Sequence, residues 1–180
     1  MWVSEIQKVP PKVFQTPLQQ RVYETLVSMN IPFERVDTDE AITMEDCVCI
    51  NERLDMQMVK TLFLCNRQQT AFYLFITAGD KPFRAKDFAA ALDAPRPSFA
   101  PPERMAEILG TKIGAATVFS VLLETAQDVT VVFDRAVLEE PCYGCSDGTT
   151  TGYMKLETAD VTGMLKRLGR AYRVIGEATI

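Results

Sequence analysis

The chain has 180 residues, 47% hydrophobic and 24% charged, proportions that fit one compact globular domain and exclude a disordered or fibrous chain. Its net charge of −5 does not attract polyanions, so any nucleic-acid contact must rest on a local group of Lys and Arg. Histidine is absent, which removes the usual general base and every triad that depends on imidazole. Catalysis would therefore use lysine, carboxylates, backbone amides or the substrate itself.

Apolar segments are too short or too charged to span a bilayer, and residues 1–11 lack the apolar centre of a secretory signal. We therefore expect a cytoplasmic protein with no membrane partner. Its five cysteines, an odd number, favour reduced thiols over a disulfide framework.

The first part of the chain predicts an extended arm at residues 1–15, because Pro10 and Pro11 prevent a regular ladder or helix. Residues 16–180 are expected to form one domain. It begins with TPLQ, a capping box in which Thr16 is the cap and proline takes the first helical position.

The following elements are predicted from periodicity and turn signals. After the helix that ends near Asn30 we expect a short strand at 31–36 and a helix at 41–53. Two apolar runs, MVKTLFLC and AFYLFIT, flank the polar loop 66–70 and predict a hairpin buried in the middle of a sheet. Later segments predict helices at 80–92, at 102–109 before Gly110, and from a Thr158 cap to Leu168, with strands after Gly114, at 129–133 and at 150–156.

This order of helices and six or seven strands indicates a mixed α/β or α+β fold without repeating βαβ units. Lys60, at the start of an apolar strand, has two interpretations. A lysine at a strand end often lays its stem on the sheet and keeps its ammonium in water. Alternatively, the charge stands there because the strand borders a substrate cleft.

A set of motifs favours the cleft. The order KTLFL, YLF, AKDFAAAL, SFA, LG, GAATVF, VVFDRAVLE and TADV, over residues 16–168, resembles the freestanding prolyl-tRNA editing domains of the YbaK/ProX superfamily. The resemblance implies a mixed, mostly antiparallel sheet or partly closed barrel flanked by helices. It also implies a trans-acting deacylase that cleaves the ester between an incorrect amino acid and the terminal adenosine of a tRNA.

The resemblance also implies the site. Lys60 would point into the cleft, with Gly114 and Ala115 as catalytic amide donors to the oxyanion. Thr61, Ala116, Thr117 and Ser146 would bind substrate. An aminoacyl ester is already activated, so positioning, polarisation and a water or ribose hydroxyl can suffice without a cofactor or metal. The expected partner is the acceptor end of tRNA, with a synthetase as a further candidate and DNA excluded; the oligomeric state is not predicted.

The chain departs from the family pattern at several positions. Thr61 replaces a common asparagine, Val118 replaces a proline, and Glu124 with Thr125 replaces an Asn-Asp pair. In the late loop PCYGCSDGTTTG, Cys145 or Ser146 stands near the position of a frequent histidine. A second hypothesis is therefore a catalytically silent relative that binds an amino acid or aminoacyl-tRNA as a sensor or adaptor.

Two further features of the sequence each have two interpretations. Cys142 and Cys145 have metal-ligand spacing, and Cys47 with Cys49 could complete a zinc site, although buried or surface thiols are the favoured interpretation. A basic subset is either a set of solvated helix faces or one side of the cleft that meets tRNA phosphates. Its members are Lys81, Arg84, Lys86, Arg96, Arg104 and Lys112.

Overall fold

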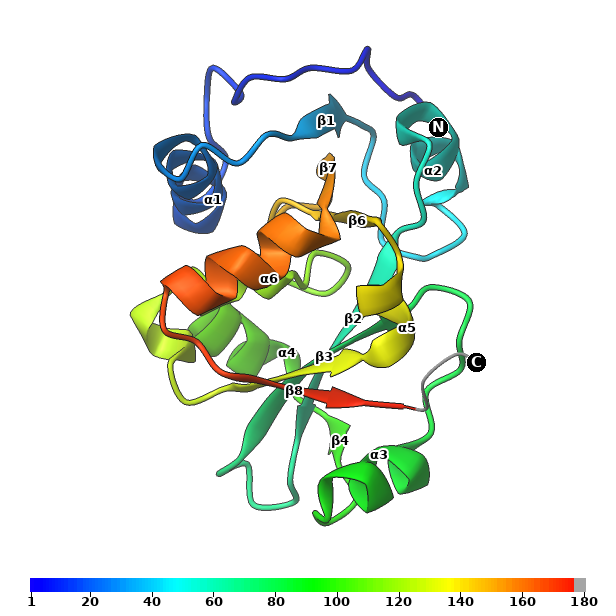
Figure 1. Ribbon diagram of the computed structural model, residues 1–180, viewed down its shortest axis with the longest axis vertical. Helices are drawn as coiled ribbons and strands as arrows, with labels where there is room; N and C mark the ends of the chain where they lie inside the picture. The colour runs from blue at the N-terminus through cyan, green and yellow to red at the C-terminus, as the bar shows by residue number, and fades with distance from the viewer. Residues whose placement is uncertain (177–180) are drawn as a thin grey trace.

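Two β-sheets form the centre of the protein, with helices packed around them (Figure 1). The computed structural model describes residues 1–176. The strands are β1 (Glu34–Asp37), β2 (Val59–Cys65), β3 (Phe72–Ala78), β4 (Ser98–Phe99), β5 (Thr130–Asp134), β6 (Cys142–Ser146), β7 (Gly152–Glu157) and β8 (Tyr172–Ile175). The five-stranded sheet has the order β4-β2-β3-β5-β8, and the three-stranded sheet has the order β1-β7-β6.

Helices connect and cover these sheets. They are α1 (Pro17–Ser28), α2 (Val48–Leu54), α3 (Ala85–Leu92), α4 (Pro102–Arg104), α5 (Arg135–Glu139) and α6 (Thr158–Arg167). A π-helical turn, η1 (Met105–Leu109), continues α4, and two 3-10 turns follow as η2 (Val118–Leu122) and η3 (Glu124–Ala126). The predicted mixed α/β class is confirmed, because β2 pairs antiparallel with β3 and β4 while β5 pairs parallel with β3 and β8. None of the helices within residues 1–176 has the length and apolar character needed to cross a bilayer.

Several local signals are confirmed. The Thr16 hydroxyl accepts a hydrogen bond from the Gln19 amide at 3.0 Å, so it caps α1 as the capping box predicts. The two apolar runs form the β2–β3 hairpin, with Leu62 opposite Phe75. The helix before Gly110 ends there because this glycine takes a left-handed φ of 65°.

Two predicted helices are shorter than expected. The segment 41–47 is a turn rather than helix, because the Asp46 carboxylate accepts from the amides of Ile42 and Thr43, each at 3.0 Å. Such side-chain bonds compete with helical backbone bonds. The helix predicted from residue 80 starts only at Ala85, since Pro82 disfavours helical geometry at the preceding residue.

Strand predictions were wrong in three places. The apolar run after Gly114 forms η2 instead of a strand, with the Thr117 hydroxyl accepting from the Phe119 amide at 3.4 Å. The CYGC segment, expected as a loop, is β6 and pairs with β7. Strand β8 was not predicted.

Two element boundaries are displaced from their predicted positions. The strand predicted at 31–36 is β1, which spans Glu34–Asp37. Helix α6 has Glu157 rather than Thr158 at its N-cap.

The N-terminal arm lies against β1. Gln7 and Arg35 exchange two backbone hydrogen bonds of 2.8 and 2.9 Å, an isolated bridge rather than a ladder. The buried Arg35 guanidinium also donates to the Val9 carbonyl at 2.7 Å and to the Gln7 side chain at 2.8 Å. These bonds tie residues 1–15 to the three-stranded sheet.

The sheets meet at one point beside the main core. Met58, just before β2, forms a parallel bridge with Gly144 of β6. The largest buried cluster lies between α1, α6 and one face of β2, including Phe63 and Leu165, and a smaller one joins Leu64 to α3 through Phe88 on the other face. Beyond the Met58 bridge the sheets separate, which leaves space between them.

Candidate functional site

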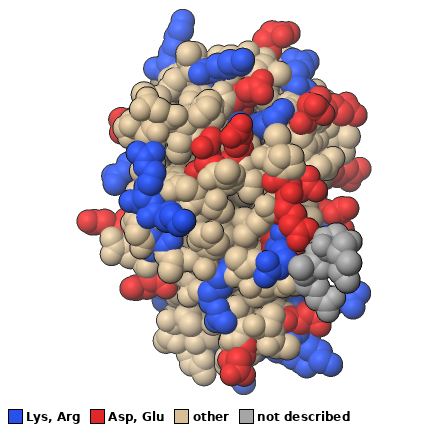
Figure 2. Space-filling view, in the orientation of Figure 1, with Lys and Arg blue, Asp and Glu red and all other residues tan. Residues whose placement is uncertain are grey.

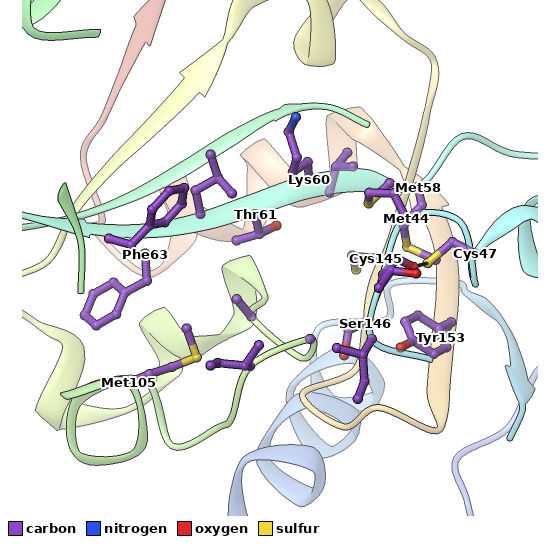
Figure 3. A pocket seen from close by; sticks show the side chains of 18 of the residues that line it. Met44, Cys47, Met58, Lys60, Thr61, Phe63, Met105, Cys145, Ser146 and Tyr153 are labelled. Atoms are coloured by element: carbon purple, nitrogen blue, oxygen red, sulfur yellow. Dashed lines mark hydrogen bonds between the residues drawn. The ribbon is translucent and has the colours of Figure 1, made fainter. Parts of the chain in front are cut away.

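A cavity of about 390 Å³ lies where the two sheets separate (Figure 3). Its floor is the stretch of β2 that has β3 on one side and, within residues 1–176, no strand on the other. Strand β4 pairs only with Leu64 and Cys65, and the bridge from Met58 leads to β6. An unpaired strand edge presents free backbone N–H and C=O groups. The cavity therefore combines an apolar interior with main-chain hydrogen-bonding capacity.

The wall comes from six separate segments of the chain. The residues that line it are Ile42, Thr43, Met44, Cys47, Met58, Val59, Lys60, Thr61, Leu62, Phe63, Phe99, Ala100, Met105, Ile113, Gly114, Ala116, Cys145, Ser146 and Tyr153. Most are apolar, and the volume falls within the usual range for small-molecule sites. Methionines on three segments make the wall adaptable in shape.

The segment after Gly114 divides its residues between the cavity and the core. Gly114 and Ala116 line the cavity, whereas Ala115 and Thr117 are fully buried and do not. The Ala115 amide donates to the Lys112 carbonyl at 3.0 Å, so it is not free for a ligand. Within residues 1–176 no acceptor is found for the amides of Gly114 and Ala116. Of the four site residues predicted in this segment, only Gly114 and Ala116 therefore lie at the cavity.

Gly114 cannot readily be another residue. Its φ is +90°, and a Cβ there would lie 3.0 Å from the Cα of Ile42. The glycine therefore lets two cavity segments, 42–47 and 113–116, approach each other closely.

Lys60 and Thr61 leave β2 in opposite directions, as alternation along a strand requires. The Thr61 side chain lies on the side of Ser146 and Met105, while the Lys60 side chain extends away from them (Figure 3). The Lys60 ammonium donates to the carbonyl oxygen of Lys81, in the loop after β3. Lys60 thus borders the cavity, but its charge lies on the outer face of β2.

Ser146 lies at the start of a rigid turn. Its hydroxyl donates to the Thr149 carbonyl at 2.6 Å and accepts from the Gly148 amide at 3.0 Å. The adjacent Asp147 carboxylate is buried and accepts from Tyr23 at 2.8 Å and from Gln19 at 2.9 Å. Ser146 therefore shapes the wall, with its hydroxyl already engaged.

The titratable groups of the inner wall are held protonated at neutral pH. Burial, with a smaller effect of Asp46, raises the pKa of the Cys47 thiol to about 11. Burial also raises the pKa of Cys145 and of Tyr153 well above their ordinary values. The Tyr153 hydroxyl donates to the Ala41 carbonyl at 2.6 Å. None of the three can supply a thiolate or phenolate base.

The cysteine pairs do not converge on a metal site. Cys47, the N-cap of α2, is buried, whereas Cys49, two residues further along, is exposed, so their thiols point apart. Among residues 1–176 no group of three or more His, Cys, Asp or Glu side chains is arranged to hold a metal ion. The two wall cysteines, Cys47 and Cys145, therefore contribute apolar contact surface to the cavity rather than metal ligands.

No member of the basic subset belongs to the cavity wall, although Arg104 and Lys112 are chain neighbours of the wall residues Met105 and Ile113. The prediction that several of its members line the cleft is wrong, since the wall contains none of them. Lys81 pairs with Asp134 at 2.6 Å, Arg104 with Glu107 at 2.9 Å and Lys112 with Glu40 at 3.3 Å. Figure 2 shows Lys and Arg gathered instead over the C-terminal end of α6, whose last turn carries Lys166 and Arg167.

Sequence reasoning missed part of the wall. The turn 42–47 was expected as a helix, and Met58, Phe99, Met105 and Tyr153 carried no recognisable signal of a site. Phe99 was quoted only within the SFA motif. These residues meet because strand pairing joins distant segments, which no local pattern reveals.

Comparison with known proteins gives the family. The chain matches the aminoacyl-tRNA editing domain family over residues 38–163 and belongs to it. The match contains β2, the segment after Gly114, all of β7 and more than half of α6, so it includes every segment of the cavity wall.

Individual relatives agree with this assignment. The chain is 24% identical over 161 residues to the prolyl-tRNA editing protein ProX of Acetoanaerobium sticklandii, covering 87% of this chain and 96% of the relative. A crystal structure of a hypothetical protein has a TM-score of 0.69 at 15% identity, covering 86% of this chain and 97% of its own. A protein proposed to be a trans-editing enzyme for prolyl tRNA synthetase has a TM-score of 0.67 at 17% identity, covering 92% and 100%. These structures share the fold of this chain, as the resemblance to YbaK/ProX proteins predicts.

Proposed function

We propose that this protein is a trans-acting deacylase of the prolyl-tRNA editing type, which hydrolyses the ester of a mischarged tRNA. The observation that carries the proposal is the apolar cavity along the unpaired edge of β2, inside the part of the chain that matches the editing family. The aminoacyl group enters this cavity, and the terminal ribose stays at its mouth. The acceptor end of tRNA is the partner, in the cytoplasm, with a synthetase as a further candidate.

The chemistry uses the substrate and main-chain donors. A water oxygen attacks the ester carbonyl carbon, the bond to the ribose oxygen breaks, and that oxygen leaves with a proton as the free hydroxyl. The neighbouring ribose hydroxyl relays the proton, because burial keeps Cys47, Cys145 and Tyr153 of the wall protonated at neutral pH. The free amides of Gly114 and Ala116 donate to the developing oxyanion, replacing the engaged amide of Ala115.

Side chains at the edge of the cavity position the substrate. The Thr61 hydroxyl donates a hydrogen bond to the substrate from the floor of the cavity. Ser146 holds the turn 146–149 in place on the wall facing Thr61. The Lys60 ammonium acts as a point charge toward a phosphate or ribose oxygen outside the cavity. Ala115 and Thr117 support this arrangement from the core.

A second candidate function is the sensor or adaptor. The outward direction of the Lys60 ammonium favours it, because Lys60 donates to the Lys81 carbonyl and the wall contains no other Lys or Arg from residues 1–176. One assay distinguishes the two functions. tRNA for proline is charged with different amino acids, and the binding of each charged tRNA and the release of free amino acid are both measured. Turnover of at least one mischarged tRNA supports the deacylase. Binding of the same tRNAs without release above the protein-free rate supports the sensor and overturns the deacylase.

A further inference from the structure

A second hollow, of about 510 Å³, lies between α1, η2 and the segments that follow η3 and α6. Its lining includes Arg21, Val121, Leu122, Gln127 and Arg170. It shares no residue with the cavity along β2, so it is a separate feature of the surface. We call it the α1–α6 hollow.

Cations gather at this hollow without carboxylate partners. Figure 2 shows Lys and Arg over the C-terminal end of α6, in a chain whose net charge is −5. Within residues 1–176, four cations that line the hollow or directly precede its lining in the last turn of α6 take part in no ion pair: Arg21, Lys166, Arg167 and Arg170. Like charges held close together repel one another. A partner that supplies negative charge would therefore stabilise this group.

The two arginines after the middle of α6 are partly engaged by main-chain carbonyls. Arg170 donates to the carbonyls of Gln127 at 2.6 Å and Val129 at 2.9 Å, and its buried Nε has no acceptor in the described part of the chain. Burial lowers the pKa of Arg170, although Asp128 acts in the opposite direction. Arg167 donates one N–H to the carbonyl at the C-cap of α1, at 3.1 Å, a favourable place for a cation. These two side chains thus have a structural role.

Arg21 and Lys166 have no such role. Both side chains are exposed, and neither has a partner among residues 1–176. The exposed side-chain amide of Gln127 is likewise without a partner there. Capping of helix ends therefore does not account for the charge of this surface. Its free donors suit a partner that carries several anionic oxygens.

The lining favours phosphates over bases as the contacted groups. None of the described residues that line the hollow is aromatic, so unpaired bases find no ring on which to stack. Arginine and lysine bind phosphate oxygens and thereby position a nucleic acid without reading its sequence.

The α1–α6 hollow is connected to the cavity through η2. Ala116 lines the cavity, whereas Val121 and Leu122 in the second half of η2 line the hollow. A 3-10 helix rises about 2 Å per residue, so the five residues of η2 span about 10 Å. A tRNA is large enough to contact both sites at once.

We infer that the α1–α6 hollow, together with Lys166 and Arg167, is a docking surface for the sugar-phosphate backbone of the tRNA body, away from the end that carries the amino acid. The inference rests on the proposed function, because that function makes tRNA the partner. Binding at this surface depends on salt and not on the base sequence.

The probe is uncharged tRNA for proline from which the unpaired 3′ end has been removed, so that no nucleotide or amino acid enters the cavity. The double substitution Arg21→Gln with Lys166→Gln removes the two cations that have no structural role. It should reduce the slope of log affinity against log salt by about 2, and weaken binding at about 50 mM salt at least about tenfold. Lys8→Gln with Arg67→Gln is the matched control, since it removes the same charge from two exposed side chains outside the hollow and the cavity. Its slope should stay close to that of the wild type.

Each other outcome overturns the docking surface. Equal slopes for the two double variants would show that Arg21 and Lys166 do not contact phosphate. Poly-L-glutamate that binds the wild type as tightly as the trimmed tRNA at equal charge, and loses the same affinity in Arg21→Gln with Lys166→Gln, would identify an acidic protein as the partner instead. Thermal unfolding of each variant checks that the fold is intact.

The same variants distinguish failure of this surface from failure of the proposed function. If the wild type hydrolyses a mischarged tRNA and Arg21→Gln with Lys166→Gln keeps its KM, the docking surface is overturned and the deacylase remains. If binding of the trimmed tRNA depends on these two residues but no mischarged tRNA is hydrolysed, the docking surface stands and the deacylase fails.

Discussion

Lys60 and Thr61 are neighbours in β2, yet the Thr61 side chain faces the cavity and the Lys60 ammonium is bound to the Lys81 carbonyl on the opposite face (Figure 3). The strand thus separates two tasks. Its inner side borders the space proposed for the aminoacyl group, and its outer side carries the charge proposed to contact a phosphate or ribose oxygen.

Lys60→Met should weaken tRNA binding in a salt-dependent way. Loss of one phosphate contact is expected to reduce the slope of log affinity against log salt by about 1. Binding of tRNA for proline, measured at several salt concentrations, checks this. Lys81→Met is the matched control, because Lys81 offers Lys60 only its backbone carbonyl and its own ammonium pairs with Asp134. Equal slopes for the wild type and Lys60→Met would show that Lys60 does not contact phosphate.

Thr61→Val should lower kcat/KM about fivefold to tenfold, the usual cost of one neutral hydrogen bond. The substitution keeps the branched shape and removes the hydroxyl, for which no partner is found within residues 1–176. Thr61→Ser restores the hydroxyl and should recover most of the activity. If Val and Ser variants are equally active, the hydroxyl does not touch the substrate.

Gly114→Ala should destabilise the fold by more than about 1 kcal/mol, because alanine is strained at a φ of +90° and its Cβ would crowd Ile42. It should also reduce deacylation, since the amide donors move with the backbone. Gly163→Ala, in α6 with nothing within 4 Å of the new Cβ, should instead stabilise by about 0.5 to 1 kcal/mol. Urea unfolding measures both, and a neutral effect at Gly114 would contradict the account of this turn.

How much of this could be predicted depended on the range of the interactions. Thr16, Gly110 and the β2–β3 hairpin were predictable because their signals are local. The direction of Lys60 was not, since β2 is apolar on both faces and its pattern does not reveal which face borders the cavity. The turn 42–47 was missed because the Asp46 cap competes with a helical composition, and β6 and β8 were missed because their pairing is long-range.

Asp134→Asn should cost stability in a pH-dependent way. Burial alone would raise the Asp134 pKa, but hydrogen bonds from Lys81, Ala136 and Thr77 outweigh it and the pKa is lowered. A carboxyl whose pKa is lowered on folding stabilises the folded state fully when the pH is above its pKa in the unfolded chain, about 4. This stabilisation is lost as the pH falls through its pKa in the folded protein. The difference in unfolding free energy between the wild type and Asp134→Asn should therefore be constant near neutral pH and shrink below about pH 4.

The exposed Asp93 gives the control for this titration. Its left-handed φ of 52° suits asparagine equally well, so Asp93→Asn should leave the unfolding free energy near neutral pH close to that of the wild type. Denaturant unfolding across the acidic range compares the three proteins. A difference for Asp134→Asn that grows as the pH falls would have the wrong sign for the contacts described.

Hydrolysis itself is tested most directly by the single-turnover release of amino acid from tRNA for proline that carries an amino acid other than proline. The wild-type protein in excess should accelerate release at least about a hundredfold over the protein-free rate for one such tRNA, the scale of one oriented oxyanion donor. Correctly charged prolyl-tRNA should be hydrolysed much more slowly. Rates equal to the protein-free rate for every amino acid, with tRNA binding intact, would contradict the deacylase.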